Sequence, residues 1–292
     1  MNDTKMIKDL RIPFWATPLR AVFRIAKKFF PNNSLLKQVS LDGIKYLVWA
    51  NEDIGKKLIL LRSFEKNETD AFKSLIKPGD VCLDVGGNVG YFTLNFAKQV
   101  GVAGKVFVFE PIRRNALIIQ LGAEINGYAK NVEVVHTAVS NKAGSVSITI
   151  PSVDGAYAYI GQDDDASVSS VDELVDCITL DDFLVEHGLI GADIVKIDVE
   201  GAELLVLEGG ASLFSSNTHQ PRIVMVELVD EFLNRYDASI AKVMDLMASY
   251  GYKSYYAASR GVLVEFLERD YNKVFNVFFM KHDKHFEAQI KQ

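Results

Sequence analysis

Residues 81–92 read VCLDVGGNVGYF, an apolar segment that runs into three closely spaced glycines. Residues 81–85 are mostly apolar and β-prone, as expected for a strand that is buried on both faces. Gly86, Gly87 and Gly90 let the backbone turn sharply and approach a ligand without an intervening Cβ. A helix is predicted to follow, and its free N–H groups favour a carboxylate or phosphate. Asp84 lies near the carboxyl end of the strand, where ligands bind in open α/β sheets.

A second acid follows the next apolar segment. Glu110 comes directly after residues 105–109 (KVFVF) and lies twenty positions beyond Gly90. A carboxylate at this distance from a glycine turn can bind the two hydroxyls of a ribose. The glycine spacing does not fit Gly-x-Gly-x-x-Gly, and the sequence holds no Gly-x-x-x-x-Gly-Lys-Ser/Thr loop, which disfavours a dinucleotide or ATP site. The alternative is that the glycines only turn the chain and that Asp84 only caps the helix. This is disfavoured because the glycine turn and Glu110 occur together at the expected spacing, so the pattern predicts a bound nucleoside.

Strand-like and helix-like segments alternate from residue 80 onward, which is typical of a parallel sheet covered by helices. The predicted strands are 81–85, 105–109, 132–138, 193–197, 222–227, 252–257, 262–267 and 274–280, and the predicted helices are 91–100, 113–126, 180–187, 202–214 and 238–250. Upstream, residues 34–64 are predicted to form a small β-rich lead-in, with segments 38–41, 44–49 and an apolar run at 58–61. A helix at 68–76 is predicted to end before Pro78 and Gly79.

The composition indicates a globular protein with a large core, since 49% of the 292 residues are hydrophobic. No apolar run reaches the length of a membrane span, and the N-terminus lacks the pattern of a secretory signal. Cys82 and Cys177 are too few for a disulfide framework, and they indicate a reducing, cytoplasmic location. The net charge of −6 disfavours general nucleic-acid binding, which needs a continuous basic face.

The N-terminal region has the opposite charge, because residues 1–40 contain eight bases and two acids. Within it, apolar residues recur at near-helical spacing over residues 14–30. One interpretation is a basic amphipathic helix that makes peripheral contact with the inner face of a membrane. The other is a helix that packs on the main domain or on a partner with its bases in water. We favour the second, because the few aromatic residues form a weak membrane anchor.

Three further segments narrow the class of protein. Residues 178–184 read ITLDDFL, residues 193–203 read DIVKIDVEGAE and residues 226–228 read VEL. Together with the DVGGNVG turn and Phe109-Glu110-Pro111, these segments resemble the FkbM-type family of S-adenosylmethionine-dependent methyltransferases. The resemblance runs from about residue 65 to residue 279 and keeps the order of every segment. Gly87 is a conservative departure, since alanine is more usual there.

The resemblance implies an α/β fold of the Rossmann-like class I methyltransferases, with a mostly parallel seven-stranded sheet and an antiparallel edge. We expect an N-terminal extension over residues 1–64, helical and then β-rich, and a catalytic domain over residues 65–285. Family members resemble O-methyltransferases, so the predicted activity is methyl transfer from S-adenosylmethionine to a hydroxyl of a saccharide. Two alternatives stay open, namely a polyketide or other small-metabolite acceptor, and a non-catalytic scaffold in glycan assembly.

The cofactor-binding residues implied by the resemblance lie in four segments. The glycine turn is expected to hold the methionine carboxylate, with Asp84 near the amino group, and Glu110 is expected to accept both ribose hydroxyls. The end of the third strand would flank the adenine, and Glu68 would close the site from the preceding helix. The full set is Glu68, Asp84, Gly86, Gly87, Asn88, Gly90, Glu110, Ala138 and Val139.

Asp198 ends the fourth predicted strand, in the region where cofactor and acceptor meet in such sheets. It is the first candidate for orienting or deprotonating the acceptor hydroxyl, because a well-placed base adds about 10²–10⁴-fold to the rate. Three histidines are alternative bases, although a core strand, a helix end and a loop also explain their positions. They are His136, His187 and His219.

Two features leave alternatives open. Acids near the ends of the fourth and fifth strands could hold Mg²⁺ through oxygen ligands. Alternatively, they only stabilise the first turn of the next helix through its dipole. These acids are Asp198, Glu200, Glu203 and Glu227. Metal-independent transfer is favoured, so no metal ligand is assigned. The long polar segment 151–177 is either a lid that binds a sugar through its tyrosines and acids or a surface insertion.

Overall fold

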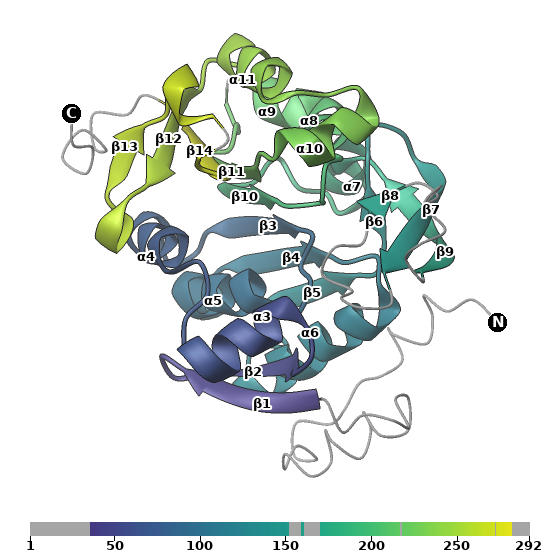
Figure 1. Cartoon of the computed structure of the whole chain (residues 1–292), viewed down its shortest axis with the longest axis vertical. Helices are drawn as coiled ribbons and strands as arrows, with labels where there is room; N and C mark the ends of the chain where they lie inside the picture. The colour runs from purple at the N-terminus through teal and green to yellow at the C-terminus, as the bar shows by residue number, and fades with distance from the viewer. Residues whose placement is uncertain (1–35, 152–158, 161–169, 217, 272, 282–292) are drawn as a thin grey trace.

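The computed structural model describes residues 36–151, 159–160, 170–216, 218–271 and 273–281 (Figure 1). The basic segment 14–30 lies outside the described residues, as do Tyr157 and residues 163–165 of the predicted lid. Within the described ranges, no helix is both long enough and apolar enough to cross a membrane.

An eight-stranded sheet forms the centre of the molecule, in the order β13-β12-β14-β11-β10-β3-β4-β5. Five neighbouring strands run parallel: β11 (Ile223–Glu227), β10 (Ile194–Ile197), β3 (Val81–Val85), β4 (Lys105–Phe109) and β5 (Val132–Val135). The antiparallel side consists of β14 (Asn276–Met280), β12 (Lys253–Ala257) and β13 (Leu263–Glu265). The α/β class with an antiparallel edge is therefore confirmed, and β13 makes the sheet one strand wider than the seven predicted.

Helices cover both faces of the sheet, with α5 and α6 on one face and α8, α9 and α11 on the other (Figure 1). The longer helices are α4 (Lys66–Leu75), α5 (Tyr91–Val100), α6 (Arg113–Asn126), α7 (Leu180–Glu186) and α11 (Ile240–Ser249). Short helical turns are α10 (Asp230–Leu233), η4 (Gly101–Ala103), η6 (Asn234–Tyr236), η7 (Ser259–Gly261) and η8 (Glu268–Asp270).

The single helix predicted at 202–214 is wrong, because the chain forms α8 (Glu203–Gly209) and α9 (Ala211–Ser215) instead. Gly209 packs against the backbone of Ser140, where a Cβ would lie 2.1 Å from the carbonyl oxygen. The glycine pair at 209–210 thus permits a close backbone contact and weakens the helix at the same place.

Alternate strand residues pack against different helix layers, as the two-residue period of a strand requires. Cys82 and Val106 belong to the core shared with α4, α5 and α6, whereas Leu83 belongs to the core under α7 to α11. Burial of both faces explains why the central strands are nearly continuously apolar. Two charged residues interrupt this pattern, because Asp84 on β3 and Lys196 on β10 are direct partners in the sheet.

The lead-in contains the predicted hairpin. β1 (Leu36–Leu41) pairs antiparallel with β2 (Ile44–Trp49), and the turn residues Asp42 and Gly43 have φ angles of 50° and 77°. Two such φ values fit a type I′ turn, whose twist matches that of the flanking strands. The hairpin shares one hydrophobic core with α4, α5 and α6. The division of the chain at residue 64 stays a prediction.

The apolar run 58–61, predicted within the β-rich lead-in, is helical. α3 (Asp53–Lys56) continues directly into the π-helix η3 (Lys57–Leu61). Gly55 lets this helix pack on the end of β2, since a Cβ there would lie 1.8 Å from the carbonyl oxygen of Trp49. Leu58 is fully buried, whereas Leu60 and Leu61 are 75% and 69% exposed. Half of the run therefore faces outward instead of joining the core.

A second sheet, in the order β6-β9-β7-β8, lies beside the main one. Its strands are β6 (Ala138–Val139), β7 (Gly144–Pro151), β8 (Tyr159–Ile160) and β9 (Ser170–Ile178). The prediction of one strand over 132–138 is wrong, because β5 ends at Val135 and the chain turns into β6. The loop predicted at 151–177 is wrong for its last part, because β9 pairs with β7 from Ser170 onward.

Candidate functional site

A cavity opens at the carboxyl ends of β3, β4, β10 and β11, which is the edge where ligands bind in open parallel sheets. The α3–η3 segment and the second sheet complete its wall. Six of the predicted site residues line this cavity: Gly86, Asn88, Glu110, Ala138, Val139 and Asp198. Sequence reasoning missed other lining residues, among them Phe64, Glu65, Asn115, Thr137 and Ile148.

The glycine turn after β3 is tightly enclosed. Gly86 has a φ of 83°, and a Cβ there would lie 1.8 Å from the backbone oxygen of Asp198. Its amide and that of Gly87 both donate to the Phe109 carbonyl, at 3.0 and 3.1 Å. The turn therefore depends on residues without side chains, and it brings the ends of β3, β4 and β10 together.

Gly87 and Gly90 pack against neighbouring elements of the fold, and neither is among the residues that line the cavity. A Cβ on Gly87 would meet the Val108 side chain at 2.2 Å, and one on Gly90 would meet Ile119 at 3.1 Å. Asn88 between them adopts a left-handed φ of 49°, which directs its amide toward the next strand's acid. Gly87 and Gly90 stay predicted cofactor residues, and their contacts here are with β4 and α6.

Glu110 is bound by the backbone on both of its oxygens. Oε2 accepts the amide of Asn88 at 2.7 Å, and Oε1 accepts the amide of Ile112 at 2.8 Å. The side chain is 4% exposed. Burial raises the pKa of Glu110 to about 8, against the opposing effect of the two amides. The carboxyl is thus fixed in place at the cavity wall before any ligand arrives.

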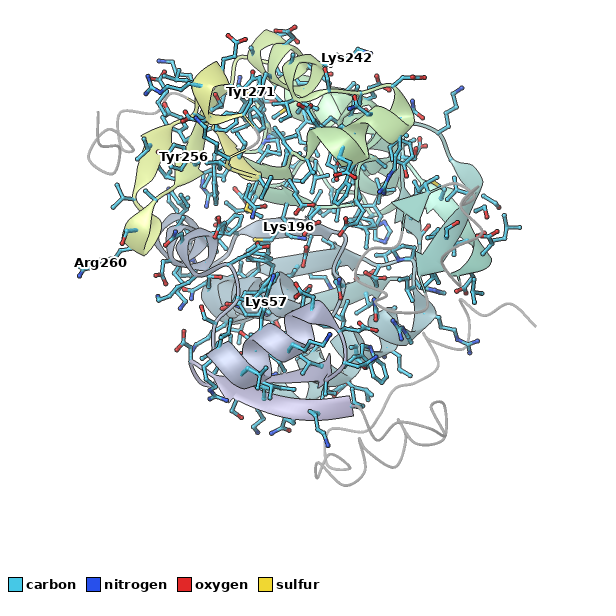
Figure 2. The ribbon with its side chains drawn as sticks, in the orientation of Figure 1. Lys57, Lys196, Lys242, Tyr256, Arg260 and Tyr271 are labelled. Carbon is cyan, nitrogen blue, oxygen red and sulfur yellow. The ribbon has the colours of Figure 1, made fainter. Side chains whose placement is uncertain are left out.

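Lys196 is a buried cation that sequence reasoning missed. Its Nζ lies 3.4 Å from Asp84 Oδ1 and 3.2 Å from Asp198 Oδ2, and it donates to the Gly86 carbonyl at 3.0 Å. Figure 2 shows Lys196 near the middle of the molecule, between the two helix layers. Burial alone would lower its pKa, but Asp198 and Asp84 together hold the pKa above its usual value.

Asp84 lies beneath the cavity instead of lining it. The residue is fully buried and accepts the Thr93 hydroxyl at 2.6 Å, so its partners are internal. Burial raises the pKa of Asp84, and Lys196 acts in the opposite direction. Its relation to the cofactor's amino group stays a prediction. The observed contacts tie the glycine turn to Lys196, and through Lys196 to Asp198.

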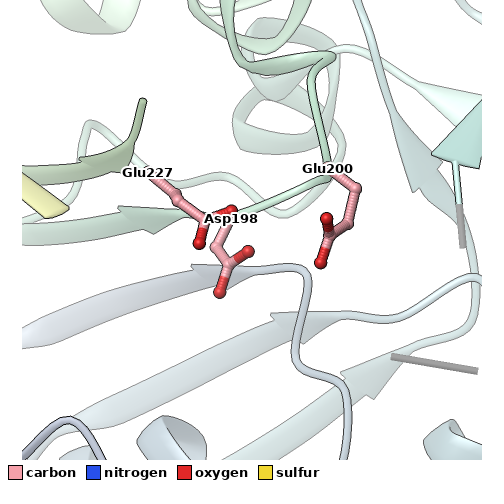
Figure 3. A group of neighbouring side chains, drawn as sticks. All are labelled: Asp198, Glu200 and Glu227. Carbon is pink, nitrogen blue, oxygen red and sulfur yellow. The ribbon is translucent and has the colours of Figure 1, made fainter. Parts of the chain in front are cut away.

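Three carboxylates meet where β10 and β11 end at the cavity, as Figure 3 shows for Asp198, Glu200 and Glu227. One oxygen of each lies within 4.8 Å of the others. Burial and then the charge of Asp198 raise the pKa of Glu200 to about 9, and the same two causes raise that of Glu227 well above its usual value. Such a group can share protons or hold a divalent cation through hard oxygen ligands.

Glu203 holds the backbone of the turn that follows Asp198. It is 1% exposed, and its Oε1 accepts the amides of Val199 and Gly201 at 3.1 and 3.0 Å. These bonds hold the turn after Asp198, in which Glu200 has a left-handed φ of 57°. Glu203 neither lines the cavity nor joins the group of three carboxylates.

None of the three candidate histidines lines the cavity in the part of the chain that is described. The His136 ring bonds the carbonyl of Pro111 at 2.9 Å, and the His187 ring stacks on Phe183 with ring centres 4.0 Å apart. His219 is exposed in the loop before β11. Asp198 therefore lines the cavity, whereas the contacts of these histidines lie elsewhere.

Glu65, one turn before Glu68, is the acid of the α4 region that reaches the cavity. It has an unusual φ of 37° at the start of α4, and its Oε2 is buried. Burial and the charge of Asp198 raise the pKa of Glu65 to about 8. Glu68 does not line the cavity, and its cofactor role stays a prediction. The sequence could not place Glu65 at the cavity, because a positive φ cannot be predicted for a glutamate.

Sheet order and site together define a class of protein. A glycine turn after the central strand, a buried acid after its neighbour and an antiparallel strand on the far side match the Rossmann-like class I methyltransferases. Residues 84–254 match the Methyltransferase FkbM domain family. This span covers more than half of the chain, so the protein belongs to that family and is an S-adenosylmethionine-dependent methyltransferase.

Individual relatives are distant. The 2-O-methyltransferase NoeI of Sinorhizobium fredii is 26% identical over 195 residues, covering 60% of this chain and 74% of that protein. The 31-O-demethyl-FK506 methyltransferase FkbM of Streptomyces tacrolimicus is 27% identical over 205 residues, covering 61% and 74%. The solved structure of methyltransferase FkbM from Methylobacillus flagellatus is 13% identical, with a TM-score of 0.42, and covers 79% of this chain and 60% of that one.

The residues at the cavity fit S-adenosylmethionine in their chemistry. Glu110 presents a preformed, backbone-held carboxyl of the kind that accepts a vicinal diol. At Gly86 the backbone can approach a ligand only because no Cβ is present. Ala138 and Val139 add a small apolar wall beyond Glu110, suited to the face of a purine.

Proposed function

We propose that this methyltransferase transfers the methyl group to a hydroxyl of a saccharide. The observation that carries the proposal is the set of carboxyl groups at the acceptor side, where Glu65, Asp198, Glu200 and Glu227 line one cavity. Several carboxyls around one site suit an acceptor with several hydroxyls, because each can accept or donate a hydrogen bond. The names of the two relatives, both O-methyltransferases, support oxygen as the accepting atom.

Asp198 is the proposed group that receives the hydroxyl proton. Its side chain is 26% exposed, so an acceptor can reach it, while Lys196 on its inner side fixes its position at 3.2 Å. Burial and the charge of Asp198 raise the pKa of Glu200 to about 9, so Glu200 is protonated at neutral pH and can donate a hydrogen bond to a neighbouring hydroxyl. The same causes raise the pKa of Glu227, which favours its protonated form. When bound, S-adenosylmethionine supplies an already activated methyl group. The protein's contribution is then mainly alignment and proton removal.

The Asp198→Asn variant tests this role. Turnover is expected to fall by about 10²–10⁴-fold, because an amide cannot take the proton. The dissociation constant of S-adenosylhomocysteine should change little, since Glu110 and the glycine turn are untouched. A fully active variant would remove Asp198 from the mechanism. Asp182→Asn is a matched control at an exposed acid that does not line the cavity.

The acceptor itself is identified by transfer of label. The protein is incubated with methyl-labelled cofactor and a fractionated glycan extract, with Asp198→Asn as the blank. Label in a saccharide fraction, stable to mild alkali as an ether is, supports the proposal. Label only in a polyketide or other small-metabolite fraction would replace it with the alternative that the FkbM relative's name suggests. Cofactor binding without transfer to any fraction would favour a scaffold.

We propose that transfer needs no metal. Lys196 already places a cation beside Asp198, which lessens the need for a second one. Activity after dialysis against a chelator should therefore equal that with added Mg²⁺. A loss of activity that Mg²⁺ restores would instead assign Asp198, Glu200 and Glu227 as its ligands.

A further inference from the structure

The end of η3 presents two adjacent leucines to solvent. Leu60 and Leu61 are 75% and 69% exposed, although Leu58, two residues before Leu60, is fully buried. A single exposed leucine is ordinary on a protein surface. These two are consecutive, and Leu60 borders a groove between η3 and β1. A surface of this kind is a candidate for contact with an apolar partner.

The charge around these leucines is of one sign. Lys37, Lys56 and Arg62 line the same groove and are exposed, and no acid is among the described residues that line it. Of the acids that flank the segment, Asp53 is paired with Lys57 at 2.6 Å, and Glu65 lines the cavity. Since the whole chain has a net charge of −6, this local excess of bases runs against the overall composition. The combination selects a partner that is both anionic and apolar.

We propose that the η3 surface, formed by Lys37, Lys56, Leu60, Leu61 and Arg62, docks on an anionic lipid bilayer. The leucines enter the boundary between headgroups and acyl chains, and the bases attract the lipid phosphates. A nucleic acid or an acidic protein would use the bases but would leave the leucines exposed. The sequence that leads into β1 has the same charge, with eight bases and two acids in residues 1–40.

The position of the η3 surface links it to the cavity. The segment that carries the leucines also lines the cavity through Asp53, Ile54 and Lys57. Figure 2 labels Lys57 on this segment, in front of the helices that cover the sheet. Docking through η3 therefore brings one rim of the cavity close to the lipid surface.

The test is co-sedimentation of the full chain with vesicles. Binding is expected to equimolar phosphatidylglycerol and phosphatidylcholine, to be weak to phosphatidylcholine alone, and to decrease with added salt. The double variant Leu60→Ser with Leu61→Ser should lower the partition coefficient at least about tenfold on anionic vesicles. Lys56→Glu should lower it through charge alone. Because all three side chains are exposed, the melting temperatures should match that of the wild type.

Two matched controls come from other exposed positions. Leu174→Ser removes a leucine that is 76% exposed on β9 beside acidic residues, and Lys142→Glu reverses an exposed base before β7. Neither should change vesicle binding. Equal binding to neutral vesicles, or unchanged binding of the leucine double variant, overturns the proposal. A change of oligomeric state in that variant also overturns it, because the surface would then belong to a second copy of the chain.

Discussion

Lys196 explains how several charges can be buried at the centre of the sheet. The amine lies between Asp84 and Asp198, and it also bonds the carbonyl of Gly86. One side chain thus connects the inner acid, the glycine turn and the acid at the acceptor side. Removing one member of a buried ion pair leaves the other without a partner, which is more costly than never having had the pair.

Lys196→Met is therefore expected to lower the free energy of unfolding by about 3–5 kcal/mol, because Asp84 loses its cation in a fully buried position. Adding Asp84→Asn should recover part of this stability by removing the unpaired charge. The double variant should still be inactive, since Asp198 has lost the group that positions it. Urea unfolding and turnover, measured on the same preparations, check both statements. Full recovery of activity in the double variant would contradict the positioning role.

Individual site residues could be predicted when their signal was local. Glu110 and Asp198 follow apolar strands directly, and both line the cavity as the sequence suggested. Lys196 could not be assigned, because its partner depends on the register between β10 and β3. A lone lysine inside an apolar strand was the available signal for it. Glu65 required knowledge of its positive φ, which is a consequence of packing and not of its residue type.

At the scale of elements, the turn between β3 and α5 is held in shape by its neighbours, and we propose that it holds the cofactor. The carbonyl of Phe109 receives two of its amides, and Glu110 receives a third from Asn88. Its shape is thus set by β4 as much as by its own glycines. A side chain at Gly86 would push against the backbone after β10.

Gly86→Ala is expected to abolish cofactor binding and to destabilise the fold by more than the ~1–2 kcal/mol cost of a left-handed alanine. Gly79→Ala is a matched control, because its φ of 91° is similar but a Cβ there meets nothing within 4 Å. The control should lose a little stability and keep its affinity for S-adenosylhomocysteine. Thermal unfolding measures the loss of stability, and calorimetry measures the affinity for S-adenosylhomocysteine. If both variants behaved alike, the positive φ alone would explain the effect, and the close contact at Gly86 would not be needed.

Element boundaries were predictable where a period and a stop signal coincided. α5 and α6 begin and end at the predicted residues, since glycines terminate both. β7 and β9 were missed, because each is stabilised by pairing with the other, and the paired residues lie 19 to 33 positions apart in the sequence. The alternation of Val146, Ile148 and Ile150 was a usable signal that the sequence analysis overlooked. η3 was misassigned because an apolar run does not reveal which side will face solvent.

At the scale of the whole molecule, several acids in the cavity wall and next to it have pKa values that burial raises. The values are about 7 for Glu203, about 8 for Glu65 and Glu110, and about 9 for Glu200. Glutamates in an unfolded chain titrate near pH ~4.3. Between these limits the folded protein binds more protons than the unfolded chain, so its stability falls as the pH rises.

The ligand-free protein is therefore expected to lose melting temperature steadily from about pH 5 to pH 9, at up to ~1.4 kcal/mol per pH unit for each such group. Glu203→Gln should flatten the lower part of this curve, up to about pH 7, because its Oε1 can still accept both amides while no proton is lost. Differential scanning calorimetry across this range measures the slope. A melting temperature that rises toward pH 9 would show that these acids are ionised in the folded state.

The central claim is that the cavity binds S-adenosylmethionine with Glu110 on its ribose. Titration calorimetry with S-adenosylhomocysteine tests it most directly, on the wild type, on Glu110→Ala and on Glu133→Ala as a control on the neighbouring strand. The wild type and the control should bind alike, and Glu110→Ala should bind roughly ten- to a hundredfold more weakly, from the loss of the hydrogen bonds to the two ribose hydroxyls. Unchanged affinity in a folded Glu110→Ala protein would contradict the claim.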